Sequence, residues 1–509
     1  MFYPEGDTIF QLGSVRFTIV SRLSTLPHEV LKLIMQQVPL EERLTSCCLV
    51  SRRLHAAAVA ATQQLKLGAF PNPWSDQRAA ALWAWLPQYG HHLTSLKLQY
   101  FPQLLQQLPC PNLQELSLKG GGVQLGPTLD GQPGVVQGCS KLTRLKLRCQ
   151  VVDALAGVVV DCLSSLSSLV HLQHLEVGES LLIGRGYQPA RVLKGWLSVS
   201  TLPQLTHLTY LNVMGLSAEN LAQLGGLTNL QELVLPAAAD GGHTILGPSS
   251  APGLAFPASL VSLGLSDIDV GVLSLVPAGL RDLSVGGRVE GPAEGPRSMF
   301  SHIAGLQQLT QLDMYLENWP PVGPAYSALT ASSNLQSLTL SQPSLPAGVW
   351  PHVFPATRKL LHLTHLWFGN HEVHEMPSAF GAADLSCLVS CCPKLCQLHT
   401  IFVQHGLHVS ELHKLASLRS MYLEFAPGEE EEIDRSMEGL AAVTQLKHMG
   451  IDVDGQDVAV ASLLPLTSLT ALKHLEICFK QDLDNGSDVL FLHVSVKAGR
   501  ICMPWFQLV

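Results

Sequence analysis

Several features are scarce in this sequence of 509 residues, and each scarcity excludes a class of protein. Charged residues make up only 14% of the chain and hydrophobic residues 47%, which excludes an intrinsically disordered chain. No run approaches 18 uninterrupted apolar residues, so we expect no transmembrane helix and no membrane partner. The net charge of −9 is spread thinly over the chain, which argues against general nucleic-acid binding.

The first residues lack an export signal, because they carry Glu5, Asp7 and Arg16 and no continuous apolar core. Without export, the 12 cysteines are better interpreted as reduced thiols than as a disulfide framework. We therefore expect the protein in the cytoplasm or the nucleus.

Catalytic and metal-binding motifs are missing as well. His371 and His374 are three residues apart, whereas the zinc-protease helix needs four, and the cysteines between Cys387 and Cys396 lack zinc-ribbon spacing. The sequence has no phosphate-binding loop, dinucleotide fingerprint or nucleophile elbow. We predict that the chain is not an enzyme, and we expect no catalytic residue, no bound metal and no cofactor.

What the sequence has in abundance is one leucine pattern: leucine, two residues, leucine or methionine, one residue, and usually another apolar residue. We call these three positions the first, second and third anchors. From Leu93 to Leu472 the first anchors advance 379 residues in 14 steps, a mean of about 27, which is the spacing of leucine-rich repeats. The second anchors of the fifteen copies are Leu96, Leu116, Leu145, Leu175, Leu211, Leu233, Leu263, Leu283, Leu312, Leu338, Leu366, Leu398, Met421, Met449 and Leu475.

The spacing of the anchors predicts the fold. The second and third anchors lie two residues apart, so on a strand both point to the same, buried face. One repeat cannot bury its apolar face alone, so neighbouring repeats must stack. We predict an α/β leucine-rich-repeat solenoid over residues 93–478, a curved horseshoe of about 15 repeats with a parallel sheet on its concave face.

The residues before, between and after the second and third anchors point out of the concave face and are our candidates for target binding. In the first three repeats they form a basic cluster, and later repeats add aromatic residues. The candidates are Lys97, Lys119, Arg144, Lys146, Arg148, Tyr210, Tyr315, Trp367 and Tyr422. The basic cluster is open to three interpretations: a solvated face, a docking site for an acidic or phosphorylated segment, or a site for a small polyanion.

Residues 24–61 do not obey the repeat. Leu26, Val30, Leu31, Ile34 and Val38 recur at helical spacing, and Pro27 suits a first helical turn. A helix is also predicted between Ser75 and Gly90, where it would cap the first repeat.

The segment from Leu26 to Arg52 resembles the F-box, through which substrate receptors dock onto the Skp-type adaptor of cullin–RING ubiquitin ligases. The family often has tryptophan where this chain has Leu54. The resemblance implies that the adaptor contacts Leu26, Pro27, Val30, Leu31, Ile34, Pro39, Leu44 and Val50.

The expected organisation is a disordered N-terminal tail (1–20), an F-box (21–66), a linker with a capping helix (67–92), the repeat array (93–478) and a C-terminal segment that could cap it (479–509). The resemblance to F-box/leucine-rich-repeat proteins implies a substrate-recognition subunit of an SCF-type E3 ubiquitin ligase. Its partners would be a Skp-type adaptor, through it a cullin and a RING protein, and an unknown target protein. The alternative is a non-ligase repeat protein, a scaffold or inhibitor, whose helical bundle is only a cap.

Overall fold

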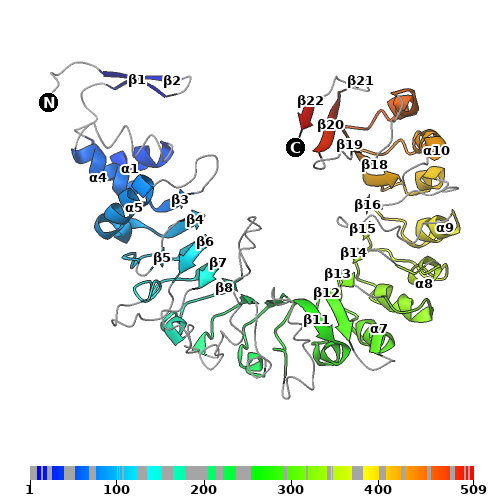
Figure 1. Cartoon of the computed structure of the whole chain (residues 1–509), viewed down its shortest axis with the longest axis horizontal. Coiled ribbons are helices and arrows are strands. Elements are labelled where there is room, and N and C mark those ends of the chain that lie inside the picture. Colours follow the sequence, from blue (N-terminus) through cyan, green and yellow to red (C-terminus); the bar gives the residue numbers. More distant parts are fainter. Residues whose placement is uncertain are drawn as a thin grey trace. The chain divides into compact units, whose positions relative to one another are not determined.

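The chain forms two units, Met1–Asn220 and Leu221–Val509, shown in the computed structural model of Figure 1. The described residues are 8–12, 15–19, 26–38, 52–67, 76–99, 101, 104–105, 108–123, 134–151, 164–178, 204–213, 222–236, 254–290, 295–316, 319–340, 345–346, 348–368, 382–399, 409–425, 430–454, 460–481, 488–497, 500–501 and 505–508.

The first unit begins with an antiparallel hairpin, β1 (Thr8–Leu12) paired with β2 (Val15–Ile19). The prediction of a disordered tail over residues 1–20 is therefore wrong for these residues. Both strands are rich in β-branched and aromatic residues, which favour strands, and only Gly13 and Ser14 separate them in the sequence.

Two helices follow, α1 (His28–Gln37) and α4 (Arg52–Ala61). Pro27 precedes α1 as its N-cap residue, and its carbonyl oxygen accepts hydrogen bonds from the backbone N–H groups of Val30 and Leu31. The helices pack through one buried cluster, to which Leu26 and Val38 add partly buried contacts. Its members are Leu31, Met35, Ala57, Ala58 and Ala61.

The sheet of the first unit is parallel. Its strands are β3 (Gln64–Leu67), β4 (Ser95–Gln99), β5 (Leu104–Leu105), β6 (Glu115–Val123), β7 (Arg144–Val151), β8 (His174–Val177) and β9 (Tyr210–Val213). The helical segments are α5 (Asp76–Tyr89), η3 (Gly90–His92) and η4 (Ser164–Ser168). α5 confirms the helix predicted before the array. β3 was not predicted, so the sheet begins one strand before the repeat at Leu93.

The second unit has the same architecture, with strands that pair in parallel. Its parallel strands are β10 (Glu232–Leu235), β11 (Ser262–Asp269), β12 (Asp282–Glu290), β13 (Gln311–Leu316), β14 (Ser337–Leu340), β15 (His365–Phe368), β16 (Gln397–His399), β17 (Ser420–Phe425), β18 (His448–Asp454) and β19 (His474–Gln481).

Helical segments connect these strands. They are η6 (Leu224–Gly226), η7 (Val270–Leu275), α7 (Gly295–Gly305), η8 (Pro324–Thr330), α8 (Trp350–Val353), α9 (Ala382–Cys391), η9 (Val409–Lys414), α10 (Glu430–Leu440) and η10 (Val460–Ser468). Within this unit the strands line the inner side and helices α7 to α10 the outer side (Figure 1).

The anchors confirm the predicted leucine-rich-repeat solenoid. All fifteen second anchors are at most 3% exposed. They are also in register: Leu116 pairs with Leu145, and Leu263 pairs with Leu283. The residues between the second and third anchors alternate with them on the opposite, less buried face of the strand, as the two-residue period requires.

A ladder of backbone hydrogen bonds stacks one repeat on the next. The carbonyl oxygen of Gln114 accepts bonds from the N–H groups of Thr143 and Arg144, both at 2.9 Å. The hydroxyl of Thr143 donates to the same oxygen at 3.1 Å. Gln173 and Thr209 repeat the arrangement. These contacts satisfy the carbonyl groups at the turn into each strand, where an unpaired buried oxygen would destabilise the stack.

The last strand of the parallel sheet is covered from the C-terminal side. β20 (Asp488–Lys497) pairs antiparallel with β19 on one side and with β22 (Trp505–Leu508) on the other, and the short β21 (Arg500–Ile501) also pairs with β20. The alternating residues around Val489–Val496 therefore form the predicted strand. Covering an edge in this way blocks edge-to-edge association.

Candidate functional site

Helix α1 exposes a stripe of apolar side chains. Val30 is 39% exposed, Leu33 62% and Ile34 38%. Residues three and four apart lie on one face of a helix, so the three side chains form a continuous surface. Its neighbour Leu31 is 0% exposed and points into the cluster against α4.

Helix α4 is joined to the sheet by a short connection. α4 ends at Ala61 and β3 begins at Gln64. The carbonyl oxygen of Gln63 accepts hydrogen bonds from the N–H groups of Thr94 and Ser95, at 2.8 and 3.1 Å. α4 also contacts the capping helix, where His55 Nε2 lies 3.2 Å from the Tyr89 hydroxyl. The helices and the first strands are thus connected by short, bonded segments.

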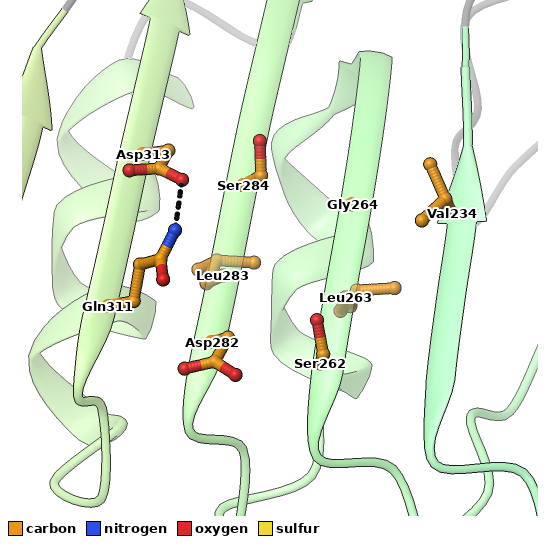
Figure 2. A pocket seen from close by; sticks show the side chains of 9 residues that line it. All are labelled: Val234, Ser262, Leu263, Gly264, Asp282, Leu283, Ser284, Gln311 and Asp313. Atoms are coloured by element: carbon orange, nitrogen blue, oxygen red, sulfur yellow. Dashed lines mark hydrogen bonds between the residues drawn. The ribbon is translucent and has the colours of Figure 1, made fainter. Parts of the chain in front are cut away.

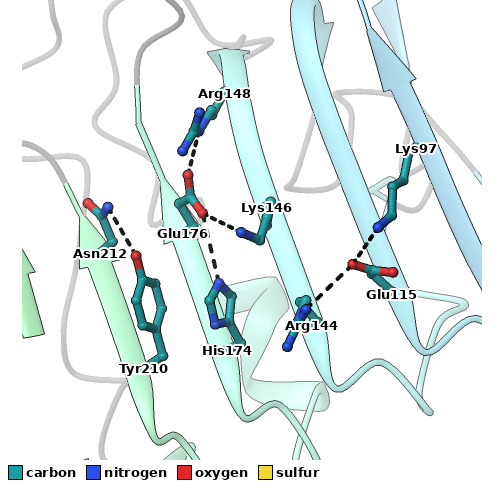
Figure 3. Close-up of polar contacts among 9 residues, drawn as sticks. All are labelled: Lys97, Glu115, Arg144, Lys146, Arg148, His174, Glu176, Tyr210 and Asn212. Atoms are coloured by element: carbon teal, nitrogen blue, oxygen red, sulfur yellow. Dashed lines mark hydrogen bonds and ion pairs between the residues drawn. The ribbon is translucent and has the colours of Figure 1, made fainter. Parts of the chain in front are cut away.

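The outward face of β4, β6, β7 and β8 brings together the predicted basic cluster (Figure 3). Lys97, Lys119, Arg144, Lys146 and Arg148 all lie on this face, and Lys119 and Arg148 are partners in the register of β6 and β7. The cluster contains two carboxylates as well, Glu115 and Glu176.

Glu115 pairs with cations on both neighbouring strands. Its Oε1 lies 3.0 Å from Lys97 Nζ and 3.8 Å from Arg144 Nη1, and Ser95 donates a hydrogen bond to its Oε2 at 2.9 Å. Burial alone would raise the pKa of the Glu115 carboxyl, but the hydrogen bonds from Lys97 and Ser95 and the charges of Lys97 and Arg144 outweigh burial and lower it. Glu115 is therefore ionised at neutral pH.

Glu176 is the centre of a second network and is only 3% exposed. Its carboxylate lies 3.0 Å from Lys146 Nζ, pairs with Arg148 Nε, and lies 3.8 Å from His174 Nε2. Burial favours a higher pKa for the Glu176 carboxyl, but hydrogen bonds from Lys146 and Arg148 hold it below its usual value.

His174 is neutral in this network. Burial first, and then the charges of Lys146 and Arg144, lower its pKa to about 4, although Glu176 acts in the opposite direction. Its ring stacks on Tyr210 with centroids 3.8 Å apart and planes at 6°, and Asn212 donates to the Tyr210 hydroxyl at 3.4 Å. With two carboxylates against five cations, the face carries about three net positive charges.

The aromatic candidates of the second unit lie on its outward sheet face. Tyr315 is 37% exposed on β13. Trp367 and Tyr422 flank His399, which stacks on both: its ring centroid is 5.9 Å from that of Trp367 and 4.5 Å from that of Tyr422. Tyr422 donates a hydrogen bond to Asp452 Oδ2 at 3.1 Å.

The model of the F-box domain family matches residues 23–59, which include both α1 and α4. No curated protein matches the sequence. The chain is an F-box and leucine-rich-repeat protein. The repeats are shown by their own buried anchors and parallel register, and the F-box by the family match.

Three similar solved structures come from bacteria. An internalin, InlF, from Listeria monocytogenes is 14% identical with a TM-score of 0.31, and the match covers 91% of this chain and all of that one. The functional domain of InlJ from the same organism is 12% identical with a TM-score of 0.32, covering 87% and 90%. The leucine-rich repeat-containing protein LegL7 from Legionella pneumophila is 12% identical with a TM-score of 0.30, covering 69% and 97%.

The F-box residues carried over from the resemblance fall into three groups. Val30 and Ile34 are exposed and adjacent on α1, and Leu26 and Pro27 lie at its start. Leu31 is buried against α4, so it offers no surface to a partner and instead holds the two helices together. Pro39, Leu44 and Val50 lie outside the described residues.

Reasoning from the sequence missed three residues of the candidate sites, Leu33, Glu176 and His399. Leu33 is more exposed than the predicted residues Val30 and Ile34 on the same helix. Glu176 and His399 occupy the position between the second and third anchors, so the rule that found Lys97 and Trp367 would also have found them.

Within the described residues, no group of three or more His, Cys, Asp or Glu side chains could hold a metal ion. In the same part of the chain, no helix is long and apolar enough to cross a membrane. F-box domains and leucine-rich repeats generally serve as protein-interaction modules.

Proposed function

We propose that the chain is the substrate receptor of an SCF-type ubiquitin ligase and has no enzymatic activity of its own. The F-box would bind a Skp-type adaptor, and through it a cullin and a RING protein, in the cytoplasm or nucleus. The repeat faces would bind the target, with no need for a membrane or a nucleic acid. The ligase would then act on the target by proximity.

The observation that carries this proposal is the apolar stripe of Val30, Leu33 and Ile34 on a helix inside the F-box match. Covering one large apolar side chain contributes about 1.5–3 kcal/mol. A helix that leaves three of them in water at neighbouring positions has the surface of a docking element.

Target binding falls, in this proposal, to the outward residues of the sheets. On the first unit these are Lys97, Lys119, Arg144, Lys146, Arg148 and Tyr210, a face whose net positive charge favours an acidic or phosphorylated segment. On the second unit they are Tyr315, Trp367 and Tyr422, because amphipathic aromatic residues contribute strongly to interfaces.

The test measures binding of the full chain to a Skp-type adaptor. Truncating Leu33 and Ile34 to alanine should weaken binding about 100-fold, since two interface side chains at more than 1 kcal/mol each are removed. Alanine suits an exposed helix position, so α1 should stay folded. The matched control is Leu464→Ala on η10, which removes a leucine that is 60% exposed elsewhere and should leave the affinity unchanged.

A folded wild-type chain that does not bind the adaptor would contradict the receptor proposal. It would instead favour the alternative, a repeat scaffold or inhibitor whose helical pair only caps the array.

A further inference from the structure

Around the anchors, the outward sheet face of the second unit carries carboxylates and no lysine or arginine within the described residues. We define this face by the residues just before, between and just after the second and third anchors. Within the described parts of β10 to β19, these positions hold no lysine or arginine. Their carboxylates are Glu232, Asp282, Asp313, Glu424, Asp452 and Glu476.

The basic residues of these strands lie outside the positions that define the face. Arg281, Arg419, Lys447 and Lys473 occupy the position before the face begins, and Arg288 and Lys480 lie two residues beyond it on β12 and β19. The corresponding face of the first unit holds the basic cluster instead. Positive charge therefore lies on the outward face of the first unit and negative charge on that of the second unit. The outward face of the second unit attracts cations.

The face is hollowed where the side chains are smallest (Figure 2). Gly264 and Ser284 lie on neighbouring strands, and Val234 and Asp313 flank them. The resulting cavity has a volume of about 210 Å³ and is also lined by Asp282. Pockets for drug-sized ligands measure about 300–1,000 Å³, so this hollow has the size for one side chain.

The two aspartates of the hollow are oriented by neutral donors. Thr310 Oγ1 donates to Asp282 Oδ1 at 2.9 Å, and Gln311 Nε2 donates to Asp313 Oδ2 at 2.7 Å (Figure 2). Glu232 lies on β10, two strands from Asp282, and burial, followed by the charge of Asp282, raises the pKa of the Glu232 carboxyl. Glu232 and Asp282 are thus close enough to repel one another, and a bound cation would relieve that repulsion.

An aromatic ladder lies further along the same face. Trp367, His399 and Tyr422 are register partners on β15, β16 and β17, with the two stacked contacts described above. Tyr422 reaches Asp452 at the far end of the ladder. The face of a Trp ring attracts guanidinium and ammonium groups. Because the Tyr422 ring lies between His399 and Gly450, Trp367 is the ring of the ladder that offers this attraction, and the ladder favours the same charge as the hollow.

We propose that this acidic and aromatic face binds an extended protein segment that carries arginine or lysine side chains. One cationic side chain enters the hollow between Asp282 and Asp313, and another lies on the ladder. The inference rests on the proposed function in that the bound segment belongs to the target.

The two subsites set the length of the segment. The hollow centres on β12 and the ladder on β16, four strands apart at about 4.8 Å each. That distance of about 19 Å is the reach of about six extended residues. A 12-residue peptide is therefore long enough to occupy both.

The experiment selects peptides on the full chain from a displayed library of random 12-residue sequences. We expect arginine and lysine to be enriched. The best peptide is then synthesised with each arginine or lysine retained or replaced by its neutral counterpart, citrulline or acetyl-lysine. Binding is measured by fluorescence anisotropy, and the neutral peptide should bind at least 10-fold more weakly.

The test variant is the double change Asp282→Asn and Asp313→Asn, which keeps an acceptor oxygen at each position. It should weaken the cationic peptide at least 10-fold and leave the neutral peptide unchanged. The matched control is Asp434→Asn with Glu438→Gln on helix α10, which removes the same charge from exposed positions of that helix. The control should bind like the wild type.

The proposal is overturned if no peptide is selected, if the selected peptides are not enriched in basic residues, or if the test and control variants weaken binding equally. The Skp-type adaptor is absent from this assay. A chain that binds the adaptor but selects no basic peptide therefore refutes this inference alone. A chain that selects basic peptides but does not bind the adaptor refutes the receptor proposal.

Discussion

We predict that only glycine fits at position 450, beneath the ring of Tyr422. A Cβ atom at Gly450 would lie 2.2 Å from Tyr422 Cδ2 and 2.8 Å from Cε2. The ring cannot retreat freely, because His399 stacks on it with centroids 4.5 Å apart. Gly450→Ala should therefore displace Tyr422 from its place in the ladder.

The expected cost follows from the contacts of that ring. Displacement breaks the hydrogen bond from Tyr422 to the Asp452 side chain, about 1.5–3 kcal/mol for a charged acceptor, and the stacking on His399, about 0.5–1.5 kcal/mol. Alanine in place of glycine returns about 0.5–1 kcal/mol of backbone entropy. We expect Gly450→Ala to lower the free energy of unfolding by about 2 kcal/mol.

Urea unfolding followed by circular dichroism and tryptophan fluorescence measures this change in a double-mutant cycle. In a Tyr422→Ala background, Gly450→Ala should be neutral or slightly stabilising, because its obstacle is gone. The control is Gly264→Ala, whose Cβ would have its nearest contact with Val234 Cγ1, at 3.3 Å, and which should cost less than about 1 kcal/mol. An equal loss from Gly450→Ala in both backgrounds would refute the steric argument.

Two further predictions concern protonation. His174 has a folded pKa of about 4 against 6.5 unfolded, so its contribution to stability is present above pH 6.5 and is lost as pH falls toward 4. Between pH 7 and 5 this amounts to about 2 kcal/mol in the free energy of unfolding, and His174→Gln should show a correspondingly smaller pH dependence in urea unfolding. Burial raises the thiol pKa of Cys110 to about 12 and that of Cys139 to about 11, so maleimide labelling with peptide mapping at pH 8 should modify Cys387 and Cys396, which are partly exposed, well before either. Rapid labelling of Cys110 or Cys139 in the folded chain would contradict their burial.

The repeats could be predicted because the anchor pattern is local and periodic. The strand that escaped prediction, β3, shows the limit of that rule. Its second and third anchor positions are Leu65 and Leu67, but its first is Thr62. That threonine is fully buried and donates its hydroxyl to the carbonyl oxygen of Ala58 in α4. A polar residue can fill an apolar position when a neighbouring helix end supplies its partner, and the sequence pattern does not contain that information.

The positions of the candidate residues could be predicted from the sequence, but the ion pairs that they form could not. The period placed Lys146 and Arg148 on the outward face correctly. The partner that offsets part of their charge, Glu176, comes from the next strand, and that contact depends on how repeats stack. The distinction between Leu31 and Leu33 likewise depends on which side of α1 packs against α4, a tertiary contact that helical spacing alone does not reveal.

The short connection from α4 into β3 constrains where bound partners can lie. Because only Thr62 and Gln63 separate the last F-box helix from the first strand, the F-box surface and the basic face of the first unit are joined without a flexible tether. A flexible tether would spread a bound partner over a large volume and dilute it. In the proposed receptor, a segment bound on β4 to β8 would therefore lie at a constrained distance from a partner bound on α1. The position of a residue on the target, more than the sequence around it, would then decide whether the ligase reaches it.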